Sequence, residues 1–296
     1  MHYQQPSLLE MSNTAYHADT ARISASGLKY IHRSPAHFYA QFLDPNRVIK
    51  PPTPAMLLGT YVHCAILEPE RFAKKYVCAD DTDICAQIVE GGAKSPRSTG
   101  EYKRWLDDFK KSAYGKEIIA QEDYNTCTAM RNAVWELRHV AKLLEGAVTE
   151  KSILFIDEGS GAACKARPDA IKHLNGRPVI IEVKTCENAS PAVFGRQVVN
   201  YGYHNQAAFY IDGFMAMGMS DVAPLFVFLA IEKEPPYASA LYYSPDDVLA
   251  LGRSENAADL RTYSECLRTG RWPGYADVIR PLQFPQWALK QVEYIN

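Results

Sequence analysis

Two carboxylates and a lysine occupy positions from which they could form a hydrolytic site. The dipeptide Asn175-Gly176 separates two apolar runs, a pattern that predicts a two-residue hairpin turn. Counting back from the turn places Asp169 opposite Glu182, with their Cβ atoms roughly 5 Å apart. Because every second residue of a strand shares a face, Glu182 and Lys184 point the same way. The three charged side chains therefore meet on one face of the predicted hairpin.

Opposed carboxylates repel each other unless a positive charge lies between them. A divalent cation is the simplest such charge, because carboxylate oxygens are its preferred ligands. A lysine at the edge of that ion would complete a site for hydrolysis by metal-activated water. No serine or cysteine stands in an obvious nucleophile motif, which argues against a covalent intermediate. The alternative is a solvated hairpin face on which Asp169 and Glu182 are paired by chance.

The composition is that of an ordinary globular protein. The 296 residues are 47% hydrophobic and 22% charged, enough for a large core in one domain or two. No apolar run approaches the length of a membrane span, and residues 1–20 lack a basic start followed by an apolar segment. We therefore expect a cytoplasmic protein with no membrane partner.

The spacing of the cysteines and the distribution of charge limit which metal clusters and nucleic-acid contacts are expected. None of the seven cysteines forms a Cys-x-x-Cys pair, so neither a zinc ribbon nor an iron–sulfur cluster is indicated. The net charge of −2 argues against indiscriminate coating of nucleic acid but not against a local basic groove. Basic residues gather in 22–50 and in 94–116, where they form either such a groove or solvated helix faces.

The N-terminal half is predicted to be helical. Residues 1–20 are polar and aperiodic and predict a flexible arm. Residues 78–100 fit no regular element, and the glycine-containing part over 91–100 predicts a mobile loop. A proline-rich connector covers 47–54. The predicted helices run from Ser24 or Ser26 to about 31 and over 35–42, 56–67, 101–114 and 123–144.

From about residue 150 the pattern changes to strands. A strand over 152–156, a turn over 157–161 and the hairpin predict a three-stranded meander, and a long helix follows over 190–219. The continuous apolar run 224–231 predicts a strand covered on both faces and parallel to a neighbour. An edge strand over 239–243 and a helix over 245–269 complete the series. We predict one domain over residues 21–296, with a helical part to about 150 and a sheet core beyond it.

The hairpin carries the pattern of the PD-(D/E)xK nuclease superfamily: Arg-Pro-Asp, twelve residues, then Glu-Val-Lys. Further segments resemble the RecB-like branch, namely Gly59-Thr60-Tyr61-Val62-His63, Leu67-Glu68-Pro69-Glu70-Arg71-Phe72 and Gln206-Ala207-Ala208-Phe209-Tyr210. Two more resemble RecE-type exonucleases (exodeoxyribonuclease VIII): Ser34-Pro35-Ala36-His37-Phe38 and Thr269-Gly270-Arg271-Trp272-Pro273-Gly274-Tyr275.

This resemblance implies an α/β fold of the restriction-endonuclease type. A mixed central sheet would lie between helices, with the α-helical N-terminal half packed on it. The resemblance makes Asp169 and Glu182 metal ligands, His63 a further ligand and Lys184 the catalytic lysine. The backbone carbonyl of Val183 would be an added ligand.

The resemblance also implies residues around this centre. Glu150 occupies the place of an extra acidic residue, with Glu158 in the following turn as the alternative. The implied DNA-binding residues are Arg33 at a terminal phosphate, and Arg167, Tyr201, Gln206 and Tyr210. The alternative for Tyr201 and its neighbour Tyr203 is a place in the core, and for Arg33 an ordinary surface position.

The implied activity is Mg²⁺-dependent exonuclease action, with Mn²⁺ as a substitute, on linear double-stranded DNA from its 5′ ends. It would leave 3′ single strands for recombination by an annealing partner of the RecT kind. The implied assembly is a ring-shaped homo-oligomer, and the implied source is a bacterium or a phage. The alternatives are a nuclease for single strands or flaps and an inactive protein that binds DNA ends.

Overall fold

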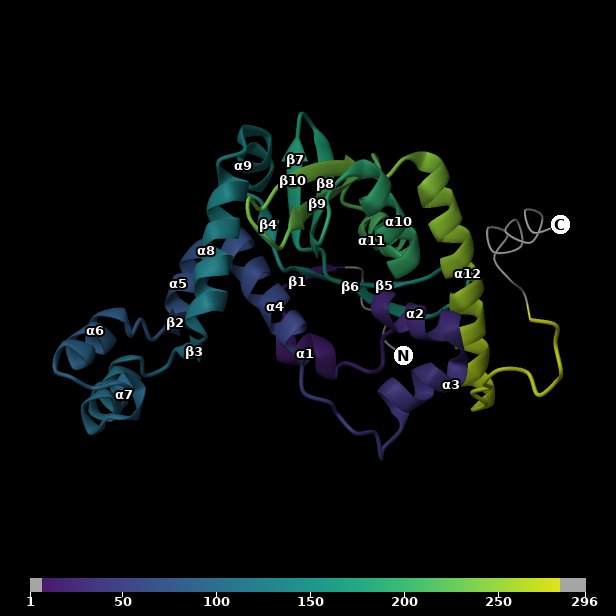
Figure 1. Ribbon diagram of the computed structural model, residues 1–296. Coiled ribbons are helices and arrows are strands. Elements are labelled where there is room, and N and C mark those ends of the chain that lie inside the picture. The colour runs from purple at the N-terminus through teal and green to yellow at the C-terminus, as the bar shows by residue number, and fades with distance from the viewer. Residues whose placement is uncertain (1–6, 283–296) are drawn as a thin grey trace, which may run out of the picture.

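A five-stranded sheet forms the centre of the computed structural model, which describes residues 7–282 (Figure 1). Strand β8 (Arg177–Cys186) lies in its middle, parallel to β9 (Leu225–Glu232) and antiparallel to β7 (Ala170–Leu174). This mixed sheet between helices confirms the predicted fold class. In spatial order the strands are β10 (Ser239–Tyr243), β9, β8, β7 and β4 (Val148–Thr149).

The β7–β8 hairpin has the predicted register. Asn175 and Gly176 have φ values of 50° and 81°, as a tight hairpin turn with two left-handed residues requires. Ala170 pairs with Ile181, so Asp169 stands directly before β7 at the level of Glu182. The local turn chemistry thus sets which carboxylates meet.

Helices cover both faces of the central sheet (Figure 1). Alternate residues of β8 enter different cores: Val179, Ile181 and Val183 pack on one side and Ile180 on the other. The first face packs against α4 (Pro54–Leu67), α5 (Pro69–Lys75), α8 (Gln121–Trp135) and α9 (Arg138–Leu144). The second packs against α2 (Ala25–Arg33), α10 (Pro191–Tyr201), α11 (Tyr203–Ala216) and α12 (Asp246–Thr269).

The prediction of a flexible arm over residues 1–20 is wrong for the described residues 7–18. β1 (Ser7–Leu9) pairs with the edge of β5 (Ser152–Ile156), and α1 (Asn13–Ala18) follows, capped by the Ser12 hydroxyl. The buried Lys165 holds α1, because its ammonium donates to the backbone carbonyls of Tyr16 and Asp19. These contacts join segments about 150 residues apart, so no local pattern announces them.

The predicted meander is also wrong. β5 and β6 (Ala163–Ala166) form a second sheet with β1, in the order β1-β5-β6, while β7 belongs to the central sheet. The chain leaves one sheet and enters the other at Arg167-Pro168-Asp169, since proline cannot continue a hydrogen-bonded ladder. Asp169 therefore lies at the junction of the two sheets.

Two predicted helices are each broken in two. The helix predicted over 190–219 is divided by Gly202, whose φ of 65° ends α10 and lets α11 start in a new direction. The helix predicted over 123–144 is divided at 136–137 into α8 and α9.

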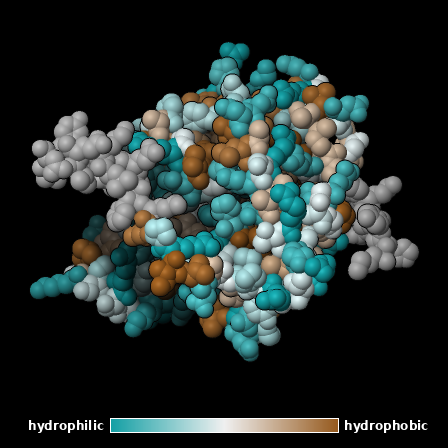
Figure 2. Space-filling view, turned by 90° about the vertical axis from the view of Figure 1, so that its right-hand side faces the viewer, coloured by the Kyte–Doolittle hydropathy of each residue, from teal (hydrophilic) through white to brown (hydrophobic). Residues whose placement is uncertain are grey.

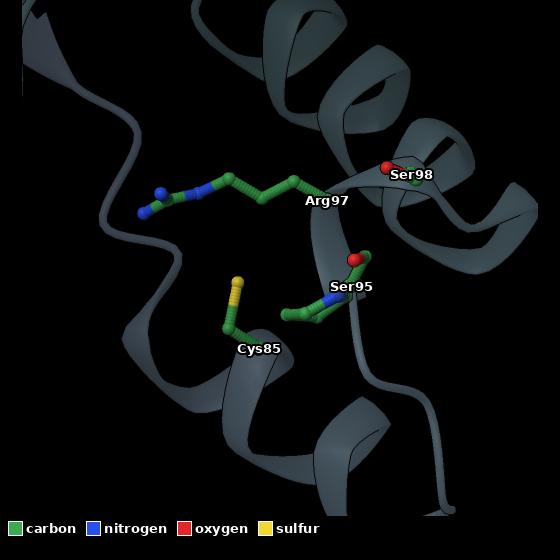
Figure 3. Close-up of a pocket in the computed structure, with 5 residues that line it drawn as sticks. Cys85, Ser95, Arg97 and Ser98 are labelled. Carbon is green, nitrogen blue, oxygen red and sulfur yellow. The ribbon is translucent and has the colours of Figure 1, made fainter.

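Residues 78–100, predicted to fit no regular element, belong largely to a small helical lobe (Figure 1). The lobe contains α6 (Thr82–Glu90), the 3₁₀ turn η2 (Pro96–Ser98) and α7 (Gly100–Ser112), and the parallel pair β2 (Tyr76–Cys78) and β3 (Glu117–Ile119) connects it to the body. The lobe contains a cavity of about 380 Å³. In Figure 3 the Arg97 side chain extends across this cavity above Cys85. The Arg97 guanidinium donates two hydrogen bonds to Asp81, at 2.6 and 3.0 Å. This cavity carries no paired carboxylates of the hydrolytic kind.

The two segments that resemble RecE-type exonucleases lie side by side. α3 (Pro35–Phe38) and the π-helical turn η1 (Tyr39–Leu43) follow α2. The Trp272 ring stacks on Phe38 with ring centroids 5.5 Å apart, and Ala36 N–H donates to Pro273 O at 3.0 Å. Beyond α12, the chain thus returns to the N-terminal helices.

α12 is a long amphipathic helix at the side of the molecule. Its buried residues Leu249, Asn256, Leu260 and Tyr263 recur at helical spacing and face the core. Figure 2 shows the side of the molecule on which α12 lies in Figure 1, with hydrophilic side chains and separate apolar patches. No helix among residues 7–282 is both long and apolar enough to cross a membrane.

We expect Gly252→Ala to destabilise the protein by about 2–3 kcal/mol, because an added Cβ would lie 2.5 Å from the His204 carbonyl oxygen of α11. Urea unfolding measures the change. The matched control is Gly195→Ala in α10, where nothing lies within 4 Å of the added atom. That variant should be stabilised by up to about 1 kcal/mol through helix propensity. Equal effects of the two substitutions would contradict the close helix contact.

Candidate active site

Asp169 and Glu182 are fixed to each other through the backbone. Asp169 Oδ2 accepts a hydrogen bond of 2.7 Å from the Val183 N–H, and Glu182 Oε2 lies 3.5 Å from the Asp169 backbone nitrogen, its donor. Both side chains are buried. The hairpin therefore holds two carboxylates close together inside the protein, as its register predicts.

Lys184 lies beside Glu182 on the same strand. Its ammonium is 3.0 Å from Glu182 Oε1 and 2.9 Å from Gln206 Oε1, and it lies 4.5 Å from the centroid of the Tyr203 ring. A carboxylate, an amide oxygen and an aromatic face thus surround one cation. Such an arrangement fixes the position of the ammonium.

α11 supplies the groups that orient Glu182. Gln206 Nε2 donates to Glu182 Oε1 at 2.7 Å and lies 3.0 Å from the Tyr210 hydroxyl. Gln206 and Tyr210 are four residues apart, so they share one face of the helix. The structure therefore brings the predicted Gln-x-x-x-Tyr segment to the carboxylates as well as to Lys184.

His63 reaches the same centre from α4 on the other face of the sheet. Its Nδ1 lies 3.3 Å from Asp169 Oδ2. Burial alone would lower the pKa of His63, but the Asp169 carboxylate outweighs burial and raises that pKa. A histidine in a largely apolar helix thus has an acidic partner, which separates it from an ordinary core histidine.

The two carboxyl groups have opposite pKa shifts. Burial, and next the charge of Asp169, raise the pKa of Glu182. Burial would also raise the pKa of Asp169, but the nearby His63 and Lys184 lower it overall. The pKa of Lys184 is raised, since Glu182 and Asp169 outweigh the effect of its burial. Lys184 is therefore a cation at neutral pH.

The donor set suits a small, hard cation. Within residues 7–282, no three His, Cys, Asp or Glu side chains lie close enough together to hold an ion by themselves. Mg²⁺ is commonly bound by only one or two carboxylates, with waters and substrate phosphates as its other ligands. Asp169 and Glu182 fit this mode, because they are adjacent oxygen donors whose repulsion a cation would relieve.

Glu150 lies near these carboxylates and Glu158 does not. The Glu150 N–H donates to Asp169 O at 3.1 Å, and burial, followed by the Asp169 charge, raises the pKa of Glu150 to about 7. Glu158 is an exposed residue of the turn after β5. For Val183, the backbone group in contact with Asp169 is its N–H.

A cavity of about 750 Å³ opens onto these groups. Glu150, Asp169, Glu182 and Lys184 line one part of it, together with Gln206 and Tyr210. The other parts are lined by residues of α1, α2, the α10–α11 junction and α12. The charged cluster therefore faces a space in which a ligand could lie, rather than a solid core.

The two arginines that the resemblance implies as DNA-binding residues lie in different surroundings. Arg33 is the last residue of α2, exposed, and not part of the cavity wall. Arg167 does line the cavity, but its guanidinium donates to Ser152 Oγ and Met11 O and lies 4.2 Å from the Tyr16 ring centroid. These contacts give Arg167 a structural task, which is to hold the N-terminal segment against β5.

Other wall residues were missed from the sequence. Asn13, Tyr16 and His17 of α1 and Lys29 of α2 all line the cavity. For α1, the signal was the Ser12 cap before a short helix. Lys29 belongs to the basic stretch 22–50, but the pattern of that stretch does not show which cation faces the site.

We expect His63→Ala to raise the metal concentration needed for half-maximal DNA cleavage, because the substitution removes the partner that holds Asp169. Partial recovery with Mn²⁺ should accompany this change. Titration of activity with Mg²⁺ and with Mn²⁺ measures both effects, and thermal unfolding provides the stability control. A lower melting temperature with an unchanged metal requirement would remove His63 from the site.

Comparisons with solved structures bear on the fold. The crystal structure of a protein from Eubacterium rectale, described as a "putative exonuclease", is similar over 95% of this chain and 98% of that chain, with a TM-score of 0.60 and 13% sequence identity. At this identity the likeness shows the fold. The structure of SSO0001 matches 75% of this chain and 88% of that chain at 18% identity, but its TM-score of 0.30 carries no argument. No curated protein matches the sequence.

A family model described as a "PDDEXK-like domain of unknown function (DUF3799)" matches residues 24–282. The matched range includes Asp169, Glu182 and Lys184 and all the segments that resemble PD-(D/E)xK nucleases. It does not distinguish the RecE type from other branches. The fold, the hairpin centre and this match agree: the chain belongs to the DUF3799 family of PDDEXK-like domains.

Proposed function

We propose that this protein is a metal-dependent nuclease that hydrolyses phosphodiester bonds of DNA. The observation that carries the proposal is the meeting of Asp169, Glu182 and Lys184 at the wall of one cavity, with contacts of 3.5 Å or less between neighbouring members. Two carboxylates that hold a cation, and a lysine that contacts the phosphate, can together activate a water and stabilise the charge that develops during phosphodiester hydrolysis.

The proposed ion is Mg²⁺, held by Asp169 and Glu182, with His63 beside Asp169. When bound, such an ion supplies an activated water and neutralises charge that develops on the phosphate. Lys184, which is a cation here, donates hydrogen bonds to a non-bridging phosphate oxygen and stabilises the same charge. Gln206 orients both Glu182 and Lys184, because it contacts each of them.

We further propose exonuclease action on linear double-stranded DNA from its 5′ ends, which leaves 3′ single strands for an annealing partner. The resemblance of residues 34–38 and 269–275 to RecE-type exonucleases supports this choice. The E. rectale protein that shares the fold is described as a putative exonuclease, and this supports exonuclease action but not the polarity or the duplex substrate. The same resemblance supports a ring-shaped homo-oligomer and a RecT-like partner.

The decisive experiment offers the full chain several DNA substrates in Mg²⁺. These are linear duplexes labelled at the 5′ or the 3′ end, covalently closed circles and single strands. Early release of 5′ label from linear duplexes, with circles spared, is the expected result. Rapid nicking of circles would contradict exonuclease action, preferential cutting of single strands would favour the alternative substrate, and end binding without cutting would indicate an inactive site.

A further inference from the structure

The cavity wall contains two neighbouring tyrosines, of which only Tyr203 contacts a residue of the hydrolytic centre. The Tyr201 and Tyr203 rings have centroids 5.7 Å apart and an interplanar angle of 31°. In a continuous helix, residues two apart point to nearly opposite sides. Gly202, with its φ of 65°, breaks the helix between them and allows both rings to line one wall. The glycine break therefore builds the pair.

Two lysines flank the pair. Lys184 of the hydrolytic centre lies 4.5 Å from the Tyr203 centroid, and Lys29 of α2 lies 5.4 Å from the Tyr201 centroid. The order along the wall is thus Lys184, Tyr203, Tyr201 and Lys29. An aromatic face and a cation, at some distance from the reacting centre, match the base and the phosphate of one nucleotide.

The exposure of Tyr201 and Lys29 indicates that these side chains are available to a ligand and are not packed in the core. Tyr201 is 51% exposed although it lies on the cavity wall, and Lys29 is exposed as well. Lys29 forms no ion pair among the described residues, whereas two acids of the same cavity wall, Asp259 and Glu255, have histidine partners. Asp259 contacts His32 at 3.1 Å, and Glu255 contacts His204 at 3.1 Å. Lys29 is therefore available to an anionic group.

The size of the cavity limits the ligand to a single strand. Sites of roughly 300–1,000 Å³ hold ligands of drug-like size, so the 750 Å³ found here accommodates one or two nucleotides. A double helix, whose major groove alone is about 12 Å wide, does not fit inside. A base can present its flat face to Tyr201 only when it has left the duplex stack.

We propose that Tyr201 and Lys29 form a subsite for one unpaired nucleotide, with its base stacked on Tyr201 and its phosphate beside the Lys29 ammonium. This inference rests on the proposed nuclease function, because the subsite would hold the strand that is to be cut. The subsite lies next to the hydrolytic centre through Tyr203, so it positions the strand relative to Lys184.

The test measures binding apart from cleavage. The probe is a short single strand with 2-aminopurine at its terminal nucleotide, whose fluorescence falls when the base stacks, and the full-length Lys184→Ala variant in Mg²⁺ prevents rapid cutting. In that background Tyr201→Ala should raise the Kd about 5- to 100-fold and abolish the fall in fluorescence, since stacking contributes about 1–3 kcal/mol per base. Tyr201→Phe should preserve both properties.

Four further measurements separate stacking from other effects. A probe with an abasic terminal nucleotide should bind equally with and without Tyr201→Ala. Tyr243→Ala removes an exposed tyrosine of β10 outside the cavity and should change nothing. Lys29→Ala should weaken both probes about equally and reduce the slope of log Kd against log salt by about one. Tyr201→Leu keeps an apolar side chain without an aromatic face and should bind like Tyr201→Ala.

Unchanged binding and quenching after Tyr201→Ala would overturn the subsite, even if the protein cuts DNA. Failure of the Lys184→Ala protein to bind the probe would overturn it as well. Quenching by a protein that cuts no DNA in any metal would instead reject the nuclease function and leave the nucleotide subsite standing.

Discussion

DNA cleavage should fall by on the order of 10³-fold or more after either Asp169→Asn or Glu182→Gln, measured as the rate of product release in Mg²⁺. Each amide keeps the shape of the side chain and can still accept a hydrogen bond, but it lacks the charge that holds a cation. The contact between the Asp169 backbone N–H and Glu182 Oε2 holds the two carboxylates together, so both would bind the same cation. The double variant should therefore be little worse than either single variant.

Glu158→Gln is the matched control for these substitutions. Glu158 is exposed and lies outside the cavity wall, so its loss should leave cleavage unchanged. Circular dichroism of every variant checks that the fold is retained. Full cutting by either single carboxylate variant in Mg²⁺ would contradict the proposed centre.

Lys184→Ala should lower the cleavage rate about 10²–10³-fold while DNA and Mg²⁺ still bind, because the ammonium acts on charge that develops during the reaction. Lys184→Arg should lower the cleavage rate as well. The ammonium is enclosed by Glu182, Gln206 and the Tyr203 ring, and a planar guanidinium would place its charge elsewhere.

Single-turnover rates measure the loss of cleavage in the Lys184 variants, and equilibrium binding measures whether DNA and Mg²⁺ still bind. Lys142→Ala, which removes an exposed lysine of α9, serves as the control and should retain the parent rate. An arginine variant that cuts at nearly the parent rate would show that position 184 needs only a positive charge.

Local chemistry explains which features the sequence predicts. Asn175-Gly176 determines a tight turn by backbone conformation alone, and that turn determines the pairing on which Asp169 and Glu182 meet. The parallel pairing of β9 with β8 follows from a strand, helical crossover and apolar strand in succession. Both inferences need only neighbouring residues and a general rule of sheet topology.

Features that depend on distant contacts were not predictable in this way. α1 has only six residues, and its place depends on Lys165 and Arg167 far along the chain. The break at Gly202 could not be predicted, because a glycine within a helical pattern can either continue the helix or end it as a C-cap. Arg33 and Lys29 are one turn apart on α2, and only the packing of that helix shows that Lys29 faces the cavity.

The stacking of Trp272 on Phe38 has a consequence for synthesis on the ribosome. Phe38 emerges roughly 230 residues before its partner, and a ribosome adds about 5–20 residues per second. For roughly 10 to 50 seconds, therefore, the apolar face of α3 has no aromatic cover from the C-terminal segment. The early helices cannot complete their packing as an independent unit during this interval. Nascent chains that stop within α12 should consequently associate with chaperones through α3.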